Sequence, residues 1–146
     1  SACNKGGPHS KNKVAEGSLM SGLAFSNTKT TICHSLSYPI TAHYGISHGQ
    51  AVAITLAPFL EWNSSAIEEK LSNLFQAFGC NSLQTTITKI QTLMANIGLE
   101  TRLSKLGISE QDLELIIKEG FYTGRADNNP RKVNEMEARS ILRSIL

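Results

Sequence analysis

The apolar residues of this 146-residue chain recur at intervals of three and four, and almost nowhere do they alternate as a strand would require. That spacing places apolar side chains on one face of an α-helix, the face that packs into a core. The clearest stripes are Ile67, Leu71, Leu74, Phe75 and Phe78; Ile87, Ile90, Met94 and Ile97; Leu113, Ile116 and Ile117; and Ile141, Leu142 and Ile145. The sequence therefore predicts an all-α fold, a multi-helix bundle with these stripes in its core.

Short local signals mark where the helices start and end. A capping side chain followed three residues later by a carboxylate or amide can satisfy the free N–H groups of a first helical turn. Pairs with this spacing are Ser65 with Glu68, Asn81 with Gln84, Ser109 with Asp112, and Asn134 with Glu137. Left-handed C-terminal caps are expected at Gly79, Gly98 and Gly120.

The chain is expected to form one domain over residues 12–146, preceded by a short start. A first helix is predicted over residues 14–26, whose apolar members are Val14, Leu19, Met20, Leu23 and Phe25. Residues 1–11 contain glycine, proline and polar residues without an apolar stripe, so we expect a disordered start, a linker or a cloning remnant there. A chain of 146 residues can bury a core without disulfide bonds.

Charge and cysteine content exclude several classes of protein. The net charge is +2, from 14 basic and 12 acidic residues that are spread along the chain, so neither a nucleic-acid surface nor a cationic membrane-binding helix is expected. Cys3, Cys33 and Cys80 are too few and too widely spaced for a disulfide framework or a paired-cysteine zinc site. No apolar run approaches the roughly 20 residues of a membrane span. We therefore expect a cytoplasmic protein.

Three of the four histidines lie in the stretch 33-CHSLSYPITAHYGISHGQAVA-53. His34 is predicted to lie in a helix that begins near Thr28. A second helix is predicted to start at Ser47, whose hydroxyl can cap it while Gln50 occupies the reciprocal position, so that His48 falls in its first turn. Gly45 lets the chain turn between the two helices. His34 and His48 can therefore point into the same space, and paired imidazoles suit iron, zinc, copper or nickel.

A structural explanation of the same histidines stays open at this point. A lone histidine is more often a core or surface residue than a metal ligand. His43 lies about one turn before Gly45, where a cation is favoured by the dipole of a helix C-terminus. His9 lies in the polar start of the chain and is expected to be exposed.

Several stretches resemble one enzyme family. The run 24-AFSNTKTTICHSLSYPITAHYGISHGQAVAITLAPFLEWN-63, residues 98–120 and the later Asn129-Pro130-Arg131 are similar to the iron-containing (group III) alcohol dehydrogenases, and the likeness covers about residues 12–146. It implies the helical C-terminal domain of a two-domain enzyme, in the fold shared with dehydroquinate synthase. NAD or NADP would then be bound mainly by an N-terminal α/β domain outside these residues, and the substrate would be a small alcohol or aldehyde.

The resemblance also implies roles for individual residues. His34 and His48 match ligands of a divalent metal, iron or possibly zinc, that polarises the substrate oxygen. Two further ligands of such enzymes, an Asp and a His, have no match, since no Asp precedes Asp112. Tyr38 stands where many relatives have a histidine with a proton-relay role. It is expected either to act as a catalytic proton donor there or to fill the pocket as an aromatic side chain. The implied substrate pocket contains Phe25, Lys29, Thr30 and Arg125.

Within this family the stretch 27-NTKTTICHSLSYP-39 is similar to the branch that reduces phosphonoacetaldehyde. The cations Lys29 and Arg125 and the hydroxyl of Thr30 would suit an anionic substrate such as a phosphonate or carboxylate. Lysine near a helix start is equally a common solvated residue, so the anionic substrate remains one of two interpretations.

Two other functions remain open from the sequence. A dehydroquinate synthase-like or glycerol dehydrogenase-like domain would share the two-domain plan. A non-catalytic helical module would explain why two metal ligands have no match. On the alcohol dehydrogenase interpretation, the chain alone is expected to be inactive, because the nucleotide-binding domain and two metal ligands are missing from it. Its exposed apolar area is expected to favour a homo-oligomer.

Overall fold

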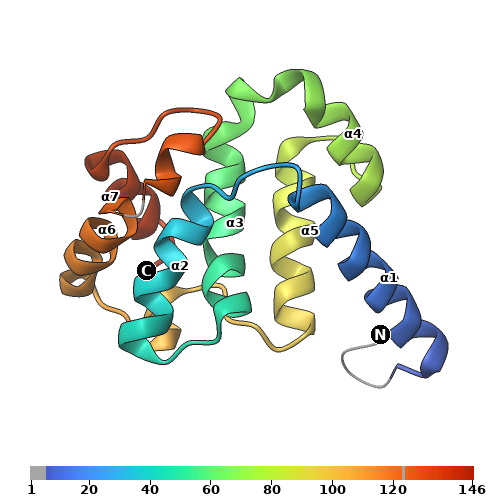
Figure 1. Ribbon diagram of the computed structural model, residues 1–146, viewed down its shortest axis with the longest axis horizontal. Coiled ribbons are helices and arrows are strands. Elements are labelled where there is room, and N and C mark those ends of the chain that lie inside the picture. Colours follow the sequence, from blue (N-terminus) through green and yellow to red (C-terminus); the bar gives the residue numbers. More distant parts are fainter. Residues whose placement is uncertain (1–5, 123) are drawn as a thin grey trace. The chain divides into compact units, whose positions relative to one another are not determined.

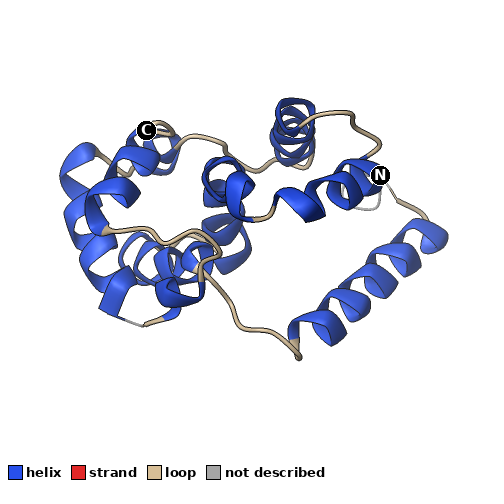
Figure 2. Cartoon of the chain, turned by 90° about the horizontal axis from the view of Figure 1, so that it is seen from above, coloured by secondary structure: helices blue, strands red, loops and turns tan. Residues whose placement is uncertain are grey.

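A computed structural model describes residues 6–122 and 124–146. The chain divides into two compact units, Ser1–Thr30 and Thr31–Leu146, and each is described by itself. The described residues contain helices, turns and loops and no strand (Figure 2), which confirms the predicted all-α class. In the same residues, no helix is both long enough and apolar enough to cross a membrane.

The first unit contains one long helix, α1 (Pro8–Phe25), and none of its side chains is buried. It begins earlier than the predicted residue 14, so residues 8–11 are helical and the expectation of a loop there is wrong. Pro8 explains the early start, because proline at the first helical position has a fixed φ that suits the helix and lacks only an N–H that would have no partner. The predicted loop over residues 1–5, like Cys3 within it, lies outside the described residues.

The second unit contains the remaining helices (Figure 1), and α2 and α3 lie at its centre. In chain order they are α2 (Ile32–Tyr44), α3 (His48–Asn63), η1 (Ser64–Ala66), α4 (Glu68–Phe78), α5 (Leu83–Asn96), η2 (Leu103–Leu106), η3 (Glu110–Asp112), α6 (Leu113–Tyr122), η4 (Arg125–Asn128) and α7 (Glu135–Arg143). Helix α2 packs against α3 and α6, while α5 and α7 pack against α3. The two helices that carry His34, His43 and His48 therefore each pack against several others.

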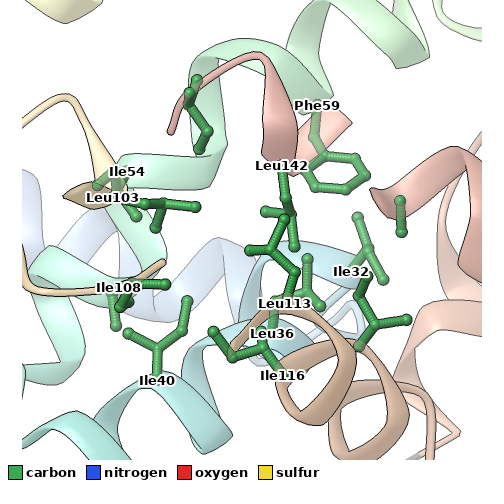
Figure 3. Close-up of a cluster of buried hydrophobic side chains, with 14 of the residues drawn as sticks. Ile32, Leu36, Ile40, Ile54, Phe59, Leu103, Ile108, Leu113, Ile116 and Leu142 are labelled. Atoms are coloured by element: carbon green, nitrogen blue, oxygen red, sulfur yellow. The ribbon is translucent and has the colours of Figure 1, made fainter. Parts of the chain in front are cut away.

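The core lies where α2, α3, α6, α7 and the segment after α5 meet (Figure 3). Its labelled side chains are Ile32, Leu36, Ile40, Ile54, Phe59, Leu103, Ile108, Leu113, Ile116 and Leu142. The predicted stripes of α5, α6 and α7 are confirmed at Ile87, Ile90, Met94, Leu113, Ile116, Ile117, Leu142 and Ile145. The α4 stripe is only half-buried, because α4 packs mainly along α5 at the margin of the unit.

The predicted helix starts divide into correct and incorrect ones. The boxes of Ser109 with Asp112 and of Asn134 with Glu137 are both formed. Asn81 with Gln84 is wrong by one residue, since Ser82 and Thr85 make that box. Ser65 with Glu68 is wrong because a turn of 3-10 helix occupies Ser64–Ala66 and α4 starts after Ile67.

The predicted glycine caps also differ in outcome. Gly79 ends α4 with a left-handed φ of 61°, as expected. Gly98 has a φ of 83° and follows Ile97, the C-cap residue of α5. Gly120 is not a cap, because it lies buried inside α6, where an added Cβ would fall 2.9 Å from Leu36 Cδ2. Its role is to let α6 approach α2.

Candidate metal centre

The two predicted ligands lie on consecutive helices that meet at a sharp corner. Helix α2 ends at Tyr44, its C-cap residue Gly45 has a left-handed φ of 66°, and α3 begins at His48. Helix α2 itself begins at Ile32 rather than near Thr28, because Thr31 has extended backbone angles. The ring centroids of His34 and His48 are 5.5 Å apart with an interplanar angle of 62°. The predicted convergence of the two imidazoles is therefore present.

Ser47 and Gln50 position α3 differently from the prediction. Ser47 is the N-cap residue, but its side chain makes no capping hydrogen bond. Gln50 is buried and exchanges two hydrogen bonds with the backbone of Glu100 instead of bonding back to Ser47. The reciprocal capping pair is thus wrong, because a distant backbone segment offers Gln50 both a donor and an acceptor.

Ser37 is a member of the site that the sequence did not reveal. Its side chain is fully buried, and its hydroxyl donates to the His34 carbonyl oxygen at 2.8 Å. The same Ser37 Oγ lies 3.3 Å from His48 Nδ1. Its spacing of three residues after His34, which puts both on one helical face, was the available signal.

Tyr38 and Arg125 lie beside the two histidines. The Tyr38 ring stacks on the His48 ring, with centroids 5.8 Å apart and an interplanar angle of 28°. The guanidinium carbon of Arg125, from η4, lies 4.8 Å from the Tyr38 ring centroid, a cation–π geometry. The structure thus brings together His34, His48, Tyr38 and Arg125, which lie up to 91 residues apart in the chain, from His34 to Arg125.

The surroundings of His34 favour its neutral form. Burial lowers the pKa of the His34 imidazole, and the nearby positive charges of His48 and Arg125 lower it further. Neutral imidazole is the form that binds transition metals. The lowered pKa of His34 therefore favours the form in which this imidazole can bind a metal ion.

Further ligands are not gathered around these two histidines. Among residues 6–122 and 124–146, no group of three or more His, Cys, Asp or Glu side chains is arranged to hold a metal. Cys33 neighbours His34 in the chain, but its thiol lies 3.8 Å from the Thr55 carbonyl oxygen, and burial raises the thiol pKa to about 11. The described residues thus bring two imidazoles together without a third candidate ligand beside them.

The other residues predicted from the sequence do not contact this cluster within the unit Thr31–Leu146 or belong to the unit Ser1–Thr30. Phe25 is the last residue of α1 and Lys29 is exposed; both, with Thr30, belong to the unit Ser1–Thr30. Their place in a substrate pocket therefore stays a prediction. His43 lies in the last turn of α2 and pairs with Glu119 at 2.8 Å, which agrees with its assignment to the helix end. His9 is exposed, in the first turn of α1.

Two cavities of the second unit bear on where a small molecule would lie. One of about 450 Å³ adjoins the cluster and is lined by Tyr38, Pro39, Ala42, Lys118, Glu119 and Tyr122. A larger cavity of about 510 Å³ lies between α3 and α7, beside Trp62 and Arg131. It contains none of the predicted site residues, whereas Tyr38 lines the smaller cavity.

Known proteins resemble the chain over most of its length. The model of the Fe-containing alcohol dehydrogenase family, C-terminal, matches residues 1–146. The 1,3-propanediol dehydrogenase of Citrobacter freundii is 30% identical over 141 residues, and the match covers 91% of this chain and 36% of that protein. The NAD-dependent methanol dehydrogenase of Bacillus methanolicus is 23% identical, over 91% of this chain and 37% of its own.

A solved structure supports the same assignment at the level of the fold. An alcohol dehydrogenase from Oenococcus oeni matches with a TM-score of 0.79 and 22% identity, over 86% of this chain and 35% of that one. The chain thus spans 36% of the length of the Citrobacter relative and a similar share of the others. Because the family model matches its whole length, this chain belongs to the Fe-containing alcohol dehydrogenase family and corresponds to the helical C-terminal domain of that family.

Proposed function

We propose that this chain is the metal-binding helical domain of an NAD(P)-dependent alcohol dehydrogenase or aldehyde reductase, with His34 and His48 as two of the metal ligands. The observation that carries the proposal is the convergence of these two rings, 5.5 Å apart, from α2 and α3. The family match favours this function over a dehydroquinate synthase-like or glycerol dehydrogenase-like domain.

The bound metal, iron or zinc, would supply a Lewis acid that polarises the oxygen of the substrate. The protein's part is to hold the ligands and to move protons. Tyr38 is proposed as the proton donor, because its hydroxyl belongs to a ring that is stacked on His48 and is partly exposed to an adjoining cavity. NAD or NADP is assigned mainly to an N-terminal domain outside these residues.

The substrate is proposed to be a small anionic aldehyde or alcohol, of the kind that the phosphonoacetaldehyde reductase branch uses. Arg125 places a permanent positive charge beside Tyr38, and Lys118 lines the adjoining cavity. A guanidinium group binds a phosphonate or carboxylate through paired charge-assisted hydrogen bonds. Lys29 and Thr30, which belong to the unit Ser1–Thr30, are proposed as substrate-binding residues on the family resemblance alone.

Metal content of the full-length enzyme tests the proposal. His34→Ala and His48→Ala should each lose the bound metal and the aldehyde reductase activity together. His43→Ala is the matched control, since His43 lies on the same helix but pairs with Glu119, and it should keep both. Retention of metal and activity by His34→Ala would exclude His34 as a metal ligand and overturn the proposal.

A further inference from the structure

We infer that Ser37 fixes the tautomer of His48, keeping the proton on Nδ1 and leaving Nε2 with a free lone pair. Ser37 contacts both candidate ligands, since its Oγ lies 2.8 Å from the His34 carbonyl oxygen and 3.3 Å from His48 Nδ1. It is a positioning residue, because it acts through His48.

The assignment follows from counting hydrogens. A serine hydroxyl has one hydrogen to donate and two lone pairs that accept. The His34 carbonyl oxygen can only accept, so the shorter contact of 2.8 Å takes the hydroxyl hydrogen. Ser37 Oγ then faces His48 Nδ1 with a lone pair, and that contact is attractive only if Nδ1 carries a hydrogen. In neutral His48, the unprotonated nitrogen is therefore Nε2.

Burial and helix geometry hold this arrangement in place. Ser37 is completely buried, so water cannot reach its hydroxyl to replace either partner. The bond to His34 lies within α2, three residues back along the same helix, and it orients the hydroxyl independently of α3. The stacked Tyr38 ring covers one face of the His48 ring. His48 is thereby restrained both by a hydrogen bond and by packing.

The consequence for metal binding rests on the proposed function. A histidine ligand usually donates its second N–H to a protein acceptor, which fixes the tautomer and orients the ring, and loss of such a partner typically weakens metal binding about 10–100-fold. Ser37 is in the position to supply that acceptor. His48 would then offer Nε2 as its ligand atom.

The tautomer itself is measurable without any metal. In the metal-free protein, ¹⁵N NMR of the imidazole nitrogens should show a protonated Nδ1 and an unprotonated Nε2 for neutral His48, with the signals identified by their loss in His48→Gln. Ser37→Ala should lose this preference, and Ser37→Thr, which keeps the hydroxyl, should retain it. A proton on Nε2 in the unmodified protein, or a tautomer unchanged by Ser37→Ala, would overturn the inference.

Zinc titration separates this inference from the proposed function. Ser37→Ala should bind Zn²⁺ about 10–100-fold more weakly than the unmodified protein, while Ser37→Thr should stay within a few-fold of it. A tautomer that shifts as expected while Zn²⁺ affinity stays constant would uphold the role of Ser37 and overturn His48 as a ligand. Amide spectra of both variants verify that the fold is retained.

Discussion

Gln50 and Glu100 exchange a pair of hydrogen bonds that joins the first turns of α3 to the segment after α5. Gln50 Nε2 donates to the Glu100 carbonyl oxygen, and the Glu100 N–H donates to Gln50 Oε1, both at 2.9 Å. Gln50 is only 7% exposed. One amide side chain thus satisfies a donor and an acceptor of a backbone segment that lies 50 residues away in the sequence.

Replacing this amide should destabilise the domain. Gln50→Leu leaves both backbone groups of Glu100 without their partner, so the free energy of unfolding should fall by about 1–3 kcal/mol. Urea denaturation measures this change in the free energy of unfolding. Gln76→Leu, on the exposed face of α4, is the matched control and should change stability by less than about 0.5 kcal/mol. Equal effects of the two substitutions would contradict a specific role for Gln50.

Gly120 should resist substitution because α6 lies against α2 there. A Cβ would fall 2.9 Å from Leu36 Cδ2 and 3.4 Å from Leu36 Cα, so Gly120→Ala should lower stability by about 1–3 kcal/mol. Gly49→Ala is the control, since no atom lies within 4 Å of its added Cβ and it also lies in a helix. That change should be neutral or stabilising by up to about 1 kcal/mol. Thermal unfolding of the two variants measures the difference in stability.

Acid should weaken the start of α6 through Asp112. The Ser109 hydroxyl and N–H, followed by the Tyr44 hydroxyl, donate to the Asp112 carboxylate and hold its pKa below the usual value. A carboxyl group with a depressed folded pKa contributes stability above its unfolded pKa of about 3.9, and this is lost as pH falls through the folded pKa. The stability advantage over Asp112→Asn should thus be constant between about pH 5 and 7 and shrink below about pH 4.

The hydroxyl of Ser109 provides the control for this pH dependence. Ser109→Ala removes the hydroxyl that does most to lower the Asp112 pKa, so the stability advantage of Asp112 over Asn should be smaller in that background. Ser104→Ala, at an exposed serine of the same segment, should leave it unchanged. An undiminished pH dependence in Ser109→Ala would show that the carboxylate is stabilised by other groups.

An anionic substrate should depend on the two predicted substrate-binding cations, Arg125 and Lys29. In the full-length enzyme, Arg125→Gln and Lys29→Ala should raise KM for an anionic aldehyde at least about 10-fold, because each removes a charge-assisted contact. KM for a neutral aldehyde of similar size should change little. Steady-state kinetics with the two aldehydes measures the difference, and an equal rise for both would exclude anion recognition by these residues.

The apolar side chains of α1 should promote self-association of the chain. Leu19, Met20 and Leu23 are each more than half exposed. Leu19→Lys combined with Leu23→Lys should therefore reduce the association constant measured by sedimentation, since exposed apolar area drives association. Ser18→Lys with Ser21→Lys adds the same charge at exposed polar positions of α1. A similar loss in this control would indicate that charge, rather than apolar contact, controls association.

The sequence by itself determined the helical class and several helix ends, because these depend on interactions over three or four residues. Apolar spacing identified α5, α6 and α7, and the capping boxes at Ser109 and Asn134 formed as predicted. The convergence of His34 and His48 was equally predictable, since only Gly45, Ile46 and Ser47 separate their helices. A link that short leaves few ways for the two helices to meet.

Only the tertiary structure decided which groups meet across long separations in the chain. The sequence predicted a capping pair of Gln50 with Ser47, but Gln50 is hydrogen-bonded to the backbone of Glu100. It also predicted a helix cap at Gly120, whereas this glycine lies inside α6, where Leu36 leaves no room for a Cβ. Spacing along one helix carries no information about which backbone lies opposite. Ser37 joined the candidate site for the same reason, because its hydroxyl meets His48 only after α3 has packed against α2.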